Sequence, residues 1–361
     1  MVSAMPALLQ AQLRHATHYQ KVLATANDFF VQGGESLARG LTLFDLEWPN
    51  IQAGHGWAAR NAVESAFELC DGYPALGYEI LPLRQHPNER LSWLETALSA
   101  ARKLGRRQSE AWHLGNLGIA YKNRGEARRA IEFFEQGLLI VREIHDRRGE
   151  ANAMGSLGLA YAQLGNARQA IDFYERQLVI VRELGDRRGE GIALNNLGLA
   201  YADLGEHRRA IEIYRDALII HRETGHLRAE GDVLGNMGTA HAALDETKLA
   251  IDFYEQRWAI ASKISDRRGV SAALGNLGNV YGELGQPSRA IEFFEKQLVI
   301  VRTIGDLQGE GTALWNISVA MDELGERKKA ITIAQQALTI FDQIEDPTVA
   351  KMREQLKSWR A

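Results

Sequence analysis

The sequence has little of several things that would narrow its function quickly. It has one cysteine, Cys70, which excludes an internal disulfide and fits a reducing compartment. No apolar run approaches the about 18 residues that a membrane span needs, and the first twenty residues lack the apolar stretch and cleavage site of a signal peptide. The 42 basic and 46 acidic residues are well mixed, so no excess charge would attract nucleic acid or anionic lipid. We therefore expect a cytoplasmic protein that binds neither nucleic acid nor membranes.

Motifs that carry chemistry are also missing. The sequence contains no phosphate-binding GxxxxGK followed by serine or threonine, no HExxH, no CxxC and no GxSxG. Residues 54–59 fit GxGxxA, but they lie within a helical pattern and no strand precedes them, so they do not predict a dinucleotide site. His113, His207 and His241 do not recur from copy to copy of the repeat described next, and we interpret them as bonded or solvated. We expect no enzyme activity, no cofactor and no metal.

What the sequence does have is a repeat. Residues 111–350 repeat every 40 residues, in six copies without insertion or deletion. One position holds an apolar residue and the next a small one, as in Leu277 and Gly278. A period of this length predicts a solenoid, because each unit is too small to bury its apolar face alone and stacks on its neighbours.

Each unit is predicted to consist of two helices. In residues 271–310, apolar residues at helical spacing mark a first helix that ends at Gly285, and a second apolar stripe ends at Gly305 and Asp306. A glycine in the middle of a helix costs about 1 kcal/mol, so Gly278 needs a reason. We expect it to face Ala290 and to let the two helices approach closely, while the aromatic Phe294 fills the gap beside the two small residues. We expect the carboxylates and arginines of the GDRRGE-like segments to form solvated salt bridges on turns and outer faces.

These residues resemble the tetratricopeptide repeat family, whose unit carries a Leu-Gly pair, an aromatic residue, an alanine and a second aromatic residue. Here they are Leu277 and Gly278, Tyr281, Ala290 and Phe294. The resemblance implies an all-α, right-handed superhelical solenoid of antiparallel helix pairs. The unit of 40 residues is longer than the common one of about 34, and this longer form resembles the Leu-Gly-Asn repeat adaptors, which hold extended peptides in a concave groove.

The ends of the array differ from its middle. Residues 7–31 and 36–60 read as two helices, residues 62–110 as a degenerate first repeat with bends at Pro74 and Pro82, and residues 347–361 as a capping helix. We therefore divide the chain into an N-terminal helical segment (1–61), the degenerate repeat (62–110), six repeats (111–346) and the cap (347–361). The first hundred residues also resemble the helical segment that precedes the tetratricopeptide sensor arms of bacterial signal-transducing ATPases, through HYQKVLATANDFF, LTLFDLEWPNIQAGHGWAARN and LSWLETALSAARKLG.

In a tetratricopeptide superhelix the first helices line the concave surface, and the residue before the Leu-Gly pair points into it. Here this position is occupied by Asn116, Ser156, Asn196, Asn236, Asn276 and Asn316. Asparagine can donate and accept hydrogen bonds at once, so these side chains could bind the backbone of an extended peptide. The alternative is that they bond to the neighbouring helix and fix the stacking of the repeats.

Neighbouring positions complete the predicted ligand-binding surface. The position before the amides holds glycine in four repeats, which would let a ligand backbone lie close to the groove floor, and Trp315 in the last, as an anchor for the ligand or as packing against the cap. Acidic residues stand near the ends of the later first helices, at Asp203, Glu283, Asp322 and Glu323. One turn after the amides come the further predicted ligand contacts Ile119, Leu159, Leu199 and Asn279.

The sequence predicts a non-enzymatic scaffold that binds a peptide or a helical segment of a partner protein in its concave groove. The alternative is a regulatory arm of a signal-transducing ATPase or effector, in which ligand binding shifts an equilibrium between two states. The identity of the partner and the oligomeric state stay open.

Overall fold

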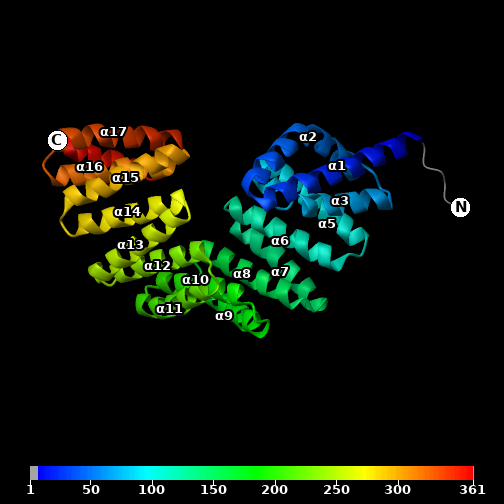
Figure 1. Cartoon of the computed structure of the whole chain (residues 1–361), viewed down its shortest axis with the longest axis horizontal. Coiled ribbons are helices and arrows are strands. Elements are labelled where there is room, and N and C mark those ends of the chain that lie inside the picture. The colour runs from blue at the N-terminus through cyan, green and yellow to red at the C-terminus, as the bar shows by residue number, and fades with distance from the viewer. Residues whose placement is uncertain (1–6, 361) are drawn as a thin grey trace. The chain divides into compact units, whose positions relative to one another are not determined.

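A computed structural model of the chain describes residues 7–360, and every regular element in this range is a helix. Figure 1 shows the helices in chain order, packed as sequential antiparallel pairs. The all-α fold is therefore as the sequence predicted. The bounds of the helices are α1 Ala7–Gln32, α2 Gly34–Arg60, α3 Glu64–Leu76, α4 Leu81–Arg84, α5 Pro87–Lys103, α6 Arg107–Asn123, α7 Ala127–Glu143, α8 Arg147–Gln163, α9 Ala167–Glu183, α10 Arg187–Asp203, α11 His207–Glu223, α12 Leu227–Ala242, α13 Thr247–Lys263, α14 Arg267–Glu283, α15 Pro287–Ile304, α16 Leu307–Glu323, α17 Arg327–Gln343 and α18 Val349–Arg360.

By compactness the chain divides into two units, residues 1–180 and 181–361, and the division falls inside α9. This division coincides with none of the domain boundaries proposed from the sequence. Among the helices of residues 7–360, none combines the length and the apolar character needed to cross a membrane.

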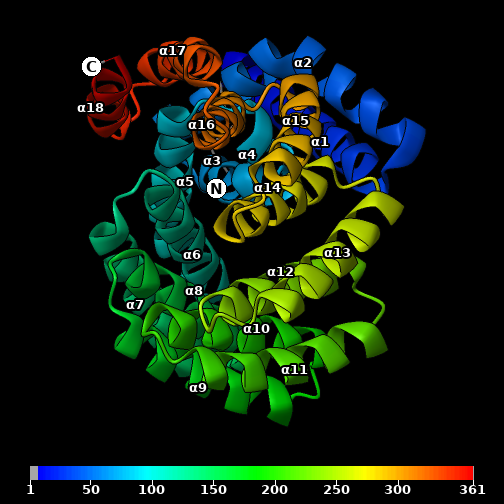
Figure 2. The ribbon, with the colours of Figure 1, turned by 90° about the vertical axis from the view of Figure 1, so that its left-hand side faces the viewer.

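Within each unit the two helices of a repeat play different roles. The first helices of successive repeats contact each other, α6 with α8 in one unit and α10 with α12, α12 with α14 and α14 with α16 in the other (Figure 2). The second helices of unit 2 make no comparable contact with one another. The first helices therefore form the more tightly packed layer of the stack, whose accessible side we call the first-helix face.

The GDRRGE-like segments are helix starts and not only turns. The Asp186 carboxylate accepts a hydrogen bond from the Gly189 amide at 2.9 Å and so caps α10. Glu190, one turn later, is 7% exposed. Its carboxylate forms ion pairs with the guanidinium groups of Arg187, in the same helix, at 2.6 Å and of Arg182, near the end of α9, at 2.7 Å. The expectation of solvated salt bridges therefore needs correcting for this glutamate, whose buried carboxylate ties one repeat to the next.

The mid-helix glycines face aromatic rings. A Cβ atom added at Gly278 would lie closer than 3.0 Å to the ring of Phe294, a separation that real Cβ atoms essentially never show. The atoms nearest to such a Cβ all belong to the Phe294 ring, which was expected to fill the gap beside the glycine, and Ala290 lies 4.0 Å from a Cβ placed at Gly282, one turn further along α14. The reason for the glycine is therefore close packing, as predicted, and its nearest neighbour is the buried aromatic ring on the second helix.

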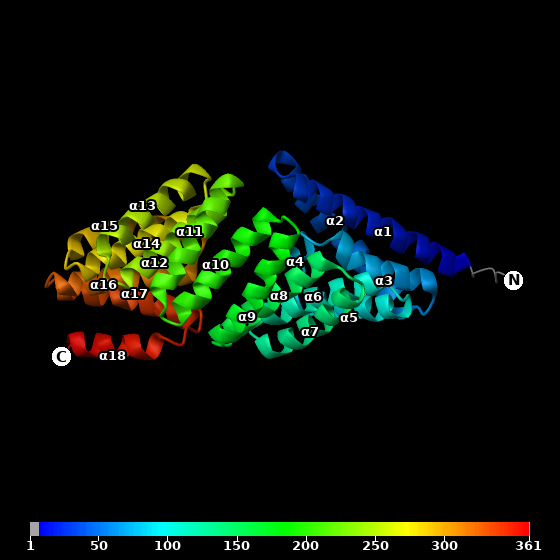
Figure 3. The same cartoon turned by 90° about the horizontal axis from the view of Figure 1, so that it is seen from below.

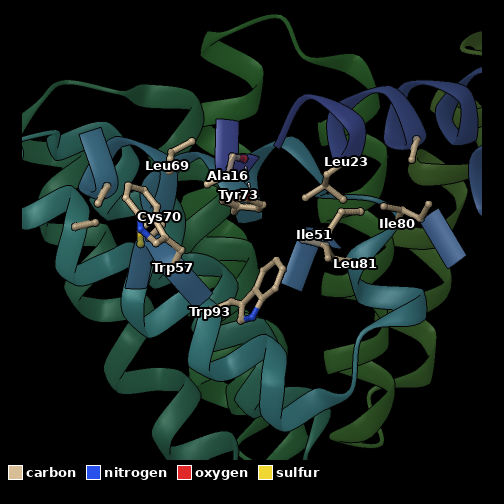
Figure 4. Packing of buried hydrophobic residues seen from close by; sticks show 14 of the residues in the cluster. Ala16, Leu23, Ile51, Trp57, Leu69, Cys70, Tyr73, Ile80, Leu81 and Trp93 are labelled. Carbon is tan, nitrogen blue, oxygen red and sulfur yellow. Dashed lines mark hydrogen bonds between the residues drawn. The ribbon is translucent and has the colours of Figure 1, made fainter. Parts of the chain in front are cut away.

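The N-terminal helices α1 to α5 form a core of their own (Figure 4). Tyr73 is fully buried there and donates a hydrogen bond from its hydroxyl to the Ala16 carbonyl at 2.8 Å. The His55 ring stacks on Trp93, with ring centroids 3.9 Å apart, and burial lowers the pKa of the His55 imidazole to about 3. Pro74 lies within α3, which ends two residues later at Leu76.

The last helix covers the end of the array. In unit 2, α18 lies beside α17 (Figure 3), and Val349, Leu356 and Trp359 are buried against it. Met352 is half-buried and Lys351 is exposed. One side of this helix thus packs on the array and the other is exposed, so that the helix closes an otherwise exposed apolar core, as a capping helix should.

Candidate functional site

The first-helix face is built from three positions in each repeat that lie one turn apart. In α6 these are Trp112, Asn116 and Ile119, and the residues between them, such as Leu114 and Leu117, are buried. Positions separated by four and then three residues share one side of a helix, so the three side chains form a single accessible stripe. The same pattern recurs in α8, α10 and α12.

The structure places the predicted ligand contacts on this face. The side chains of the amide series are partly accessible in all six repeats, and Ile119, Leu159 and Leu199 are 37% to 40% exposed. Asn279 is exposed as well. Whether they contact a ligand stays a prediction. The partly accessible positions are Asn116, Ser156, Asn196, Asn236, Asn276 and Asn316.

The amide series divides between the two roles that the sequence left open. Asn236 donates a hydrogen bond to the Asn195 side chain of the preceding repeat at 2.9 Å, and Asn316 donates one to Asn279 at 3.2 Å. These two amides link neighbouring first helices, as the stacking alternative requires. Asn116 instead donates to the Trp112 carbonyl, one turn back in its own helix, at 2.9 Å. Within residues 7–360, the side chains of Ser156, Asn196 and Asn276 have no hydrogen-bond partner, so they are available to a ligand.

Trp315 packs against the cap. Its ring stacks on that of Trp359 in α18, with centroids 5.9 Å apart and planes 14° apart. It is half-buried and belongs to the apolar cluster under the last helix. The packing interpretation of Trp315 therefore has direct contacts behind it, and its role as a ligand anchor stays a prediction.

Most of the glycines that precede the predicted ligand-binding side chains have no free space beside them. A Cβ atom at Gly155 would meet the Gln177 side chain at 2.6 Å, and one at Gly275 would meet Gln297 at 2.8 Å. The second helix thus fills the space that the first helix leaves, and the prediction of an open floor was wrong at these positions. At Gly115 nothing lies within 4 Å of an added Cβ.

A cavity of about 360 Å³ opens at Gly115, between α6, α7 and α8. Its lining includes Trp112 and Ile119 from the first-helix face and Phe134 and Gly137 from α7. Trp112 was not among the predicted ligand contacts, which lie from the residue before the Leu-Gly pair towards the end of the helix and not one turn back. The helical spacing from Trp112 to Asn116 was the signal that would have found it.

Acidic side chains near the ends of the first helices are less uniform than predicted. Asp203 and Glu283 are exposed. The Asp322 carboxylate, in contrast, forms an ion pair at 2.7 Å with the guanidinium of Arg327, which begins α17, so its charge is partly compensated within the chain. Glu323 is exposed too and has no ion pair among residues 7–360, so the acidic character of the first-helix face is carried by Asp203, Glu283 and Glu323.

Comparison with known proteins agrees with this repeat geometry. The sequence pattern of the tetratricopeptide repeat matches five overlapping stretches, residues 111–183, 149–223, 189–263, 227–300 and 269–343, and together they cover more than half of the chain. The chain belongs to the tetratricopeptide repeat family. No curated protein matches the sequence significantly.

Several solved structures share the fold of this tetratricopeptide protein at low sequence identity. A signal transduction ATPase with numerous domains from Pyrococcus horikoshii, with a tetratricopeptide repeat sensor, is 16% identical with a TM-score of 0.61, over 96% of this chain and 55% of that one. A Rap protein complexed with competence and sporulation factor is 12% identical with a TM-score of 0.57, over 98% of both chains. BtubC from P. vanneervenii is 20% identical with a TM-score of 0.55, over 62% of this chain and 93% of that one. These similarities show the fold, and the first two extend beyond the repeats into the N-terminal helices.

The first complete tetratricopeptide repeat is joined to the N-terminal helices by a buried polar cluster. The Asp71 carboxylate of α3 contacts the His113 ring of α6 at 2.8 Å and the Arg106 guanidinium at 3.0 Å. Burial alone would raise the pKa of Asp71, but the hydrogen bonds from His113 and Arg106 outweigh it and lower the pKa below its ordinary value. A hollow of about 410 Å³ beside this cluster is lined by Tyr78 and Trp112, among others.

The remaining chemistry of the array is sparse. Within residues 7–360, no group of three or more histidine, cysteine or acidic side chains is arranged to hold a metal ion. His241 is bonded to Glu246 at 2.5 Å. The Cys70 thiol is buried, and burial raises its pKa to about 11, so the thiolate that would react as a nucleophile is scarce at neutral pH.

Proposed function

We propose that this tetratricopeptide protein is a non-enzymatic scaffold that binds an extended peptide or a helical segment of a partner protein along its first-helix face. The observation that carries the proposal is the set of large apolar side chains left accessible there. Trp112, Ile119 and Leu159 in unit 1 and Ile192 and Leu199 in unit 2 are each 37% to 40% exposed. Covering such side chains would stabilise a complex, because apolar area removed from water contributes about 25 cal/mol per Å².

Polar groups on the same face complement these anchors. Asn196 and Asn276 have side-chain amides without partners among residues 7–360, and amides can bond to peptide backbone whatever its side chains. A few such bonds at about 1 kcal/mol each fall short of the roughly 8 kcal/mol of micromolar binding, so apolar anchors are needed too. In a solved structure of similar fold, a Rap protein is complexed with competence and sporulation factor, which supports a binding role.

The test compares this face with the opposite side of the helix pairs. Leu139 on α7 and Ile219 on α11 are 68% and 55% exposed, and they lie on second helices. They provide a matched control for Leu159 and Leu199 on the first helices. The double variants Leu159→Asp/Leu199→Asp and Leu139→Asp/Ile219→Asp would be used with the intact chain to capture proteins from the native lysate, with mass spectrometry of what is retained.

We expect the first-helix variant to lose the specific partners that the intact chain retains, since a carboxylate would replace an apolar contact. The control variant should retain them. If the control loses the partners and the first-helix variant keeps them, binding takes place on the second helices and the proposal is wrong. Circular dichroism of both variants would show whether the helices are intact.

A second candidate function is that of a sensor arm, in which partner binding is transmitted to the N-terminal helices. The buried cluster of Asp71, Arg106 and His113 favours it, because it couples α3 to α6 next to the proposed binding face. Under this proposal, binding of a captured partner should change amide hydrogen exchange in α1 to α3, and Asp71→Asn should abolish the change without reducing affinity. If partner binding changes amide hydrogen exchange in the intact chain only within the repeats, the sensor proposal is contradicted.

A further inference from the structure

Two positions in each repeat face each other across the helix pair, and their side chains compensate in size. Where the first helix has glycine, at Gly155 and Gly275, the second helix has a long side chain that fills the space, Gln177 and Gln297. Gly235 is filled by Arg257 in the same way.

The compensation also runs in the other direction. Where the first helix has a larger residue, the second helix has alanine at the facing position: Ala217 in the repeat of Asn195, and Ala337 in the repeat of Trp315. Five repeats thus keep the volume of the pair filled by one residue or the other. This is what close packing of a protein interior requires.

The first complete repeat is the exception, because both positions are glycine. An added Cβ at Gly115 would meet nothing within 4 Å, and one at Gly137 would meet only ordinary contacts at 3.6 Å or more. The cavity of about 360 Å³ lies where the missing side chain would be. The other repeats show what the fold normally places there, so the hollow is a local departure from the pattern and not a general property of the stacking.

The walls of this cavity indicate what would occupy it. The large side chains of its lining are mostly apolar, with Phe134 and Val141 from α7 and Trp112 and Ile119 from α6. An apolar protein cavity of about 150 Å³ binds benzene, so this one is large enough for a leucine, a phenyl or an indole side chain. Because it opens on the first-helix face, such a side chain can enter it from a bound peptide.

The rim of the cavity adds a charge preference. Its charged residues are Asp146 and Arg148. The Asp146 carboxylate caps α8 by accepting from the Gly149 amide at 2.9 Å. The Arg148 side chain is exposed and forms no ion pair within residues 7–360. Asn152 and Ser156 complete the rim and offer groups that can bond to a peptide backbone.

We infer that the cavity between α6, α7 and α8 is the anchor site for one bulky apolar side chain of the partner peptide, and that an acidic residue next to it in the peptide contacts Arg148. The inference rests on the proposed function and specifies where and how the peptide is held. The open glycine pair makes the first complete repeat the one that selects the partner by its side chain.

The test fills the cavity with a residue that the fold already accepts. Gly137→Gln fills the cavity from α7, as Gln177 does beside Gly155. Gly115→Asn fills it from α6, where Asn195 stands in its own repeat. A library of random twelve-residue peptides displayed on phage would be selected on the intact chain, and the enriched peptides would be synthesised and titrated calorimetrically against the intact chain, both variants and Arg148→Ala. Circular dichroism and thermal melts would accompany each titration.

We expect the enriched peptides to share a bulky apolar residue beside an acidic one. Each filled variant should weaken binding roughly tenfold to hundredfold, as expected from losing one buried apolar side chain, while melting no lower than the intact chain. Arg148→Ala should lower the affinity for peptides that carry the acidic residue. It should not change the affinity for analogues in which an amide side chain replaces the acidic one. Replacing the apolar residue of the peptide by alanine should cost affinity for the intact chain and not for the filled variants.

Other outcomes separate the two proposals. If the intact chain enriches peptides and both filled variants bind them with unchanged affinity, the anchor site is wrong and the scaffold proposal stands. If no peptide is enriched on the intact chain, the anchor site and the peptide-binding function are both contradicted. If only one filled variant unfolds, the other decides, since each closes the same cavity from a different helix.

Discussion

The contact between the mid-helix glycine and the aromatic ring makes a quantitative prediction for Gly278→Ala. Replacing glycine by alanine inside a helix normally stabilises it by about 1 kcal/mol. Here the new Cβ would lie closer than 3.0 Å to the ring of Phe294, which is only 3% exposed and has little room to move. Overpacking of this kind costs about 1 to 3 kcal/mol, so we expect a net loss of up to about 2 kcal/mol.

A matched control lies four residues further along the same helix. Gly282 also lies in α14, and an added Cβ there would be 4.0 Å from Ala290, an ordinary contact. Gly282→Ala should therefore stabilise the chain by up to about 1 kcal/mol through helix propensity alone. The two substitutions are chemically identical, so the difference in their sign isolates the steric effect of the ring.

The last repeat supplies a natural double substitution for the same contact. Ser318 replaces the glycine there, and Ala334 replaces the aromatic residue at the facing position. In the double-mutant cycle of Gly278→Ser and Phe294→Ala, we therefore expect the double variant to be more stable than the sum of the single effects, by about 1 to 3 kcal/mol.

The assay is urea unfolding followed by circular dichroism, with amide hydrogen exchange in α14 and α15. The second measurement is needed because repeat arrays do not always unfold in two states. If Gly278→Ala proves as stable as Gly282→Ala, the ring does not require the glycine and the packing argument is refuted. Additive effects in the double-mutant cycle would refute it independently.

Three further predictions concern other parts of the chain. Glu190→Gln should destabilise unit 2 by about 1 to 3 kcal/mol in urea unfolding, because it removes the charged hydrogen bonds to Arg187 and Arg182 at 2.6 and 2.7 Å. The control Glu212→Gln, at an exposed position, should change the stability little, and equal effects of the two variants would contradict the role of the buried carboxylate. The pKa of His55 is about 3 in the folded chain and 6.5 when unperturbed, so unfolding takes up a proton below pH 6.5. The free energy of unfolding should therefore fall by about 2 kcal/mol from pH 7 to pH 5. Urea unfolding of the intact chain and of His55→Gln at both pH values would measure this loss, which the variant should lack. Trp359→Ala should lower the free energy of unfolding by about 3 to 5 kcal/mol in urea unfolding, because it removes a buried ring that stacks on Trp315, and unchanged stability would argue against the stacked pair.

The two-helix repeat could be predicted from the sequence because its signals are local. The apolar stripes and the terminal glycines act within one or two turns, and Gly125 and Gly285 indeed end their helices with positive φ values. The cap helix followed from the same periodicity. Local signals of this kind need no knowledge of the neighbouring repeat.

The candidate site depended on contacts between elements, and there the sequence was less informative. Which amides are free depends on pairs such as Asn195 and Asn236, which belong to different repeats. Whether a glycine is open depends on a residue on the other helix, as with Gly115 and Gly137. The latter signal was present in the sequence, but only a comparison of facing positions across all six repeats reveals it.

The size compensations described above have a consequence for how such an array can change. Each compensating pair, whether glycine with an aromatic ring or glycine with glutamine, lies inside a single repeat, so duplicating, deleting or exchanging a whole repeat keeps the two partners of every such pair together. A crossover between the two helices of one repeat would separate the partners and leave a clash or a void. Genetic exchange and protein engineering should therefore both succeed most often when the joints fall at the turns between repeats, such as Gly185-Asp186, and when the unusual first repeat is transplanted to another array as a whole.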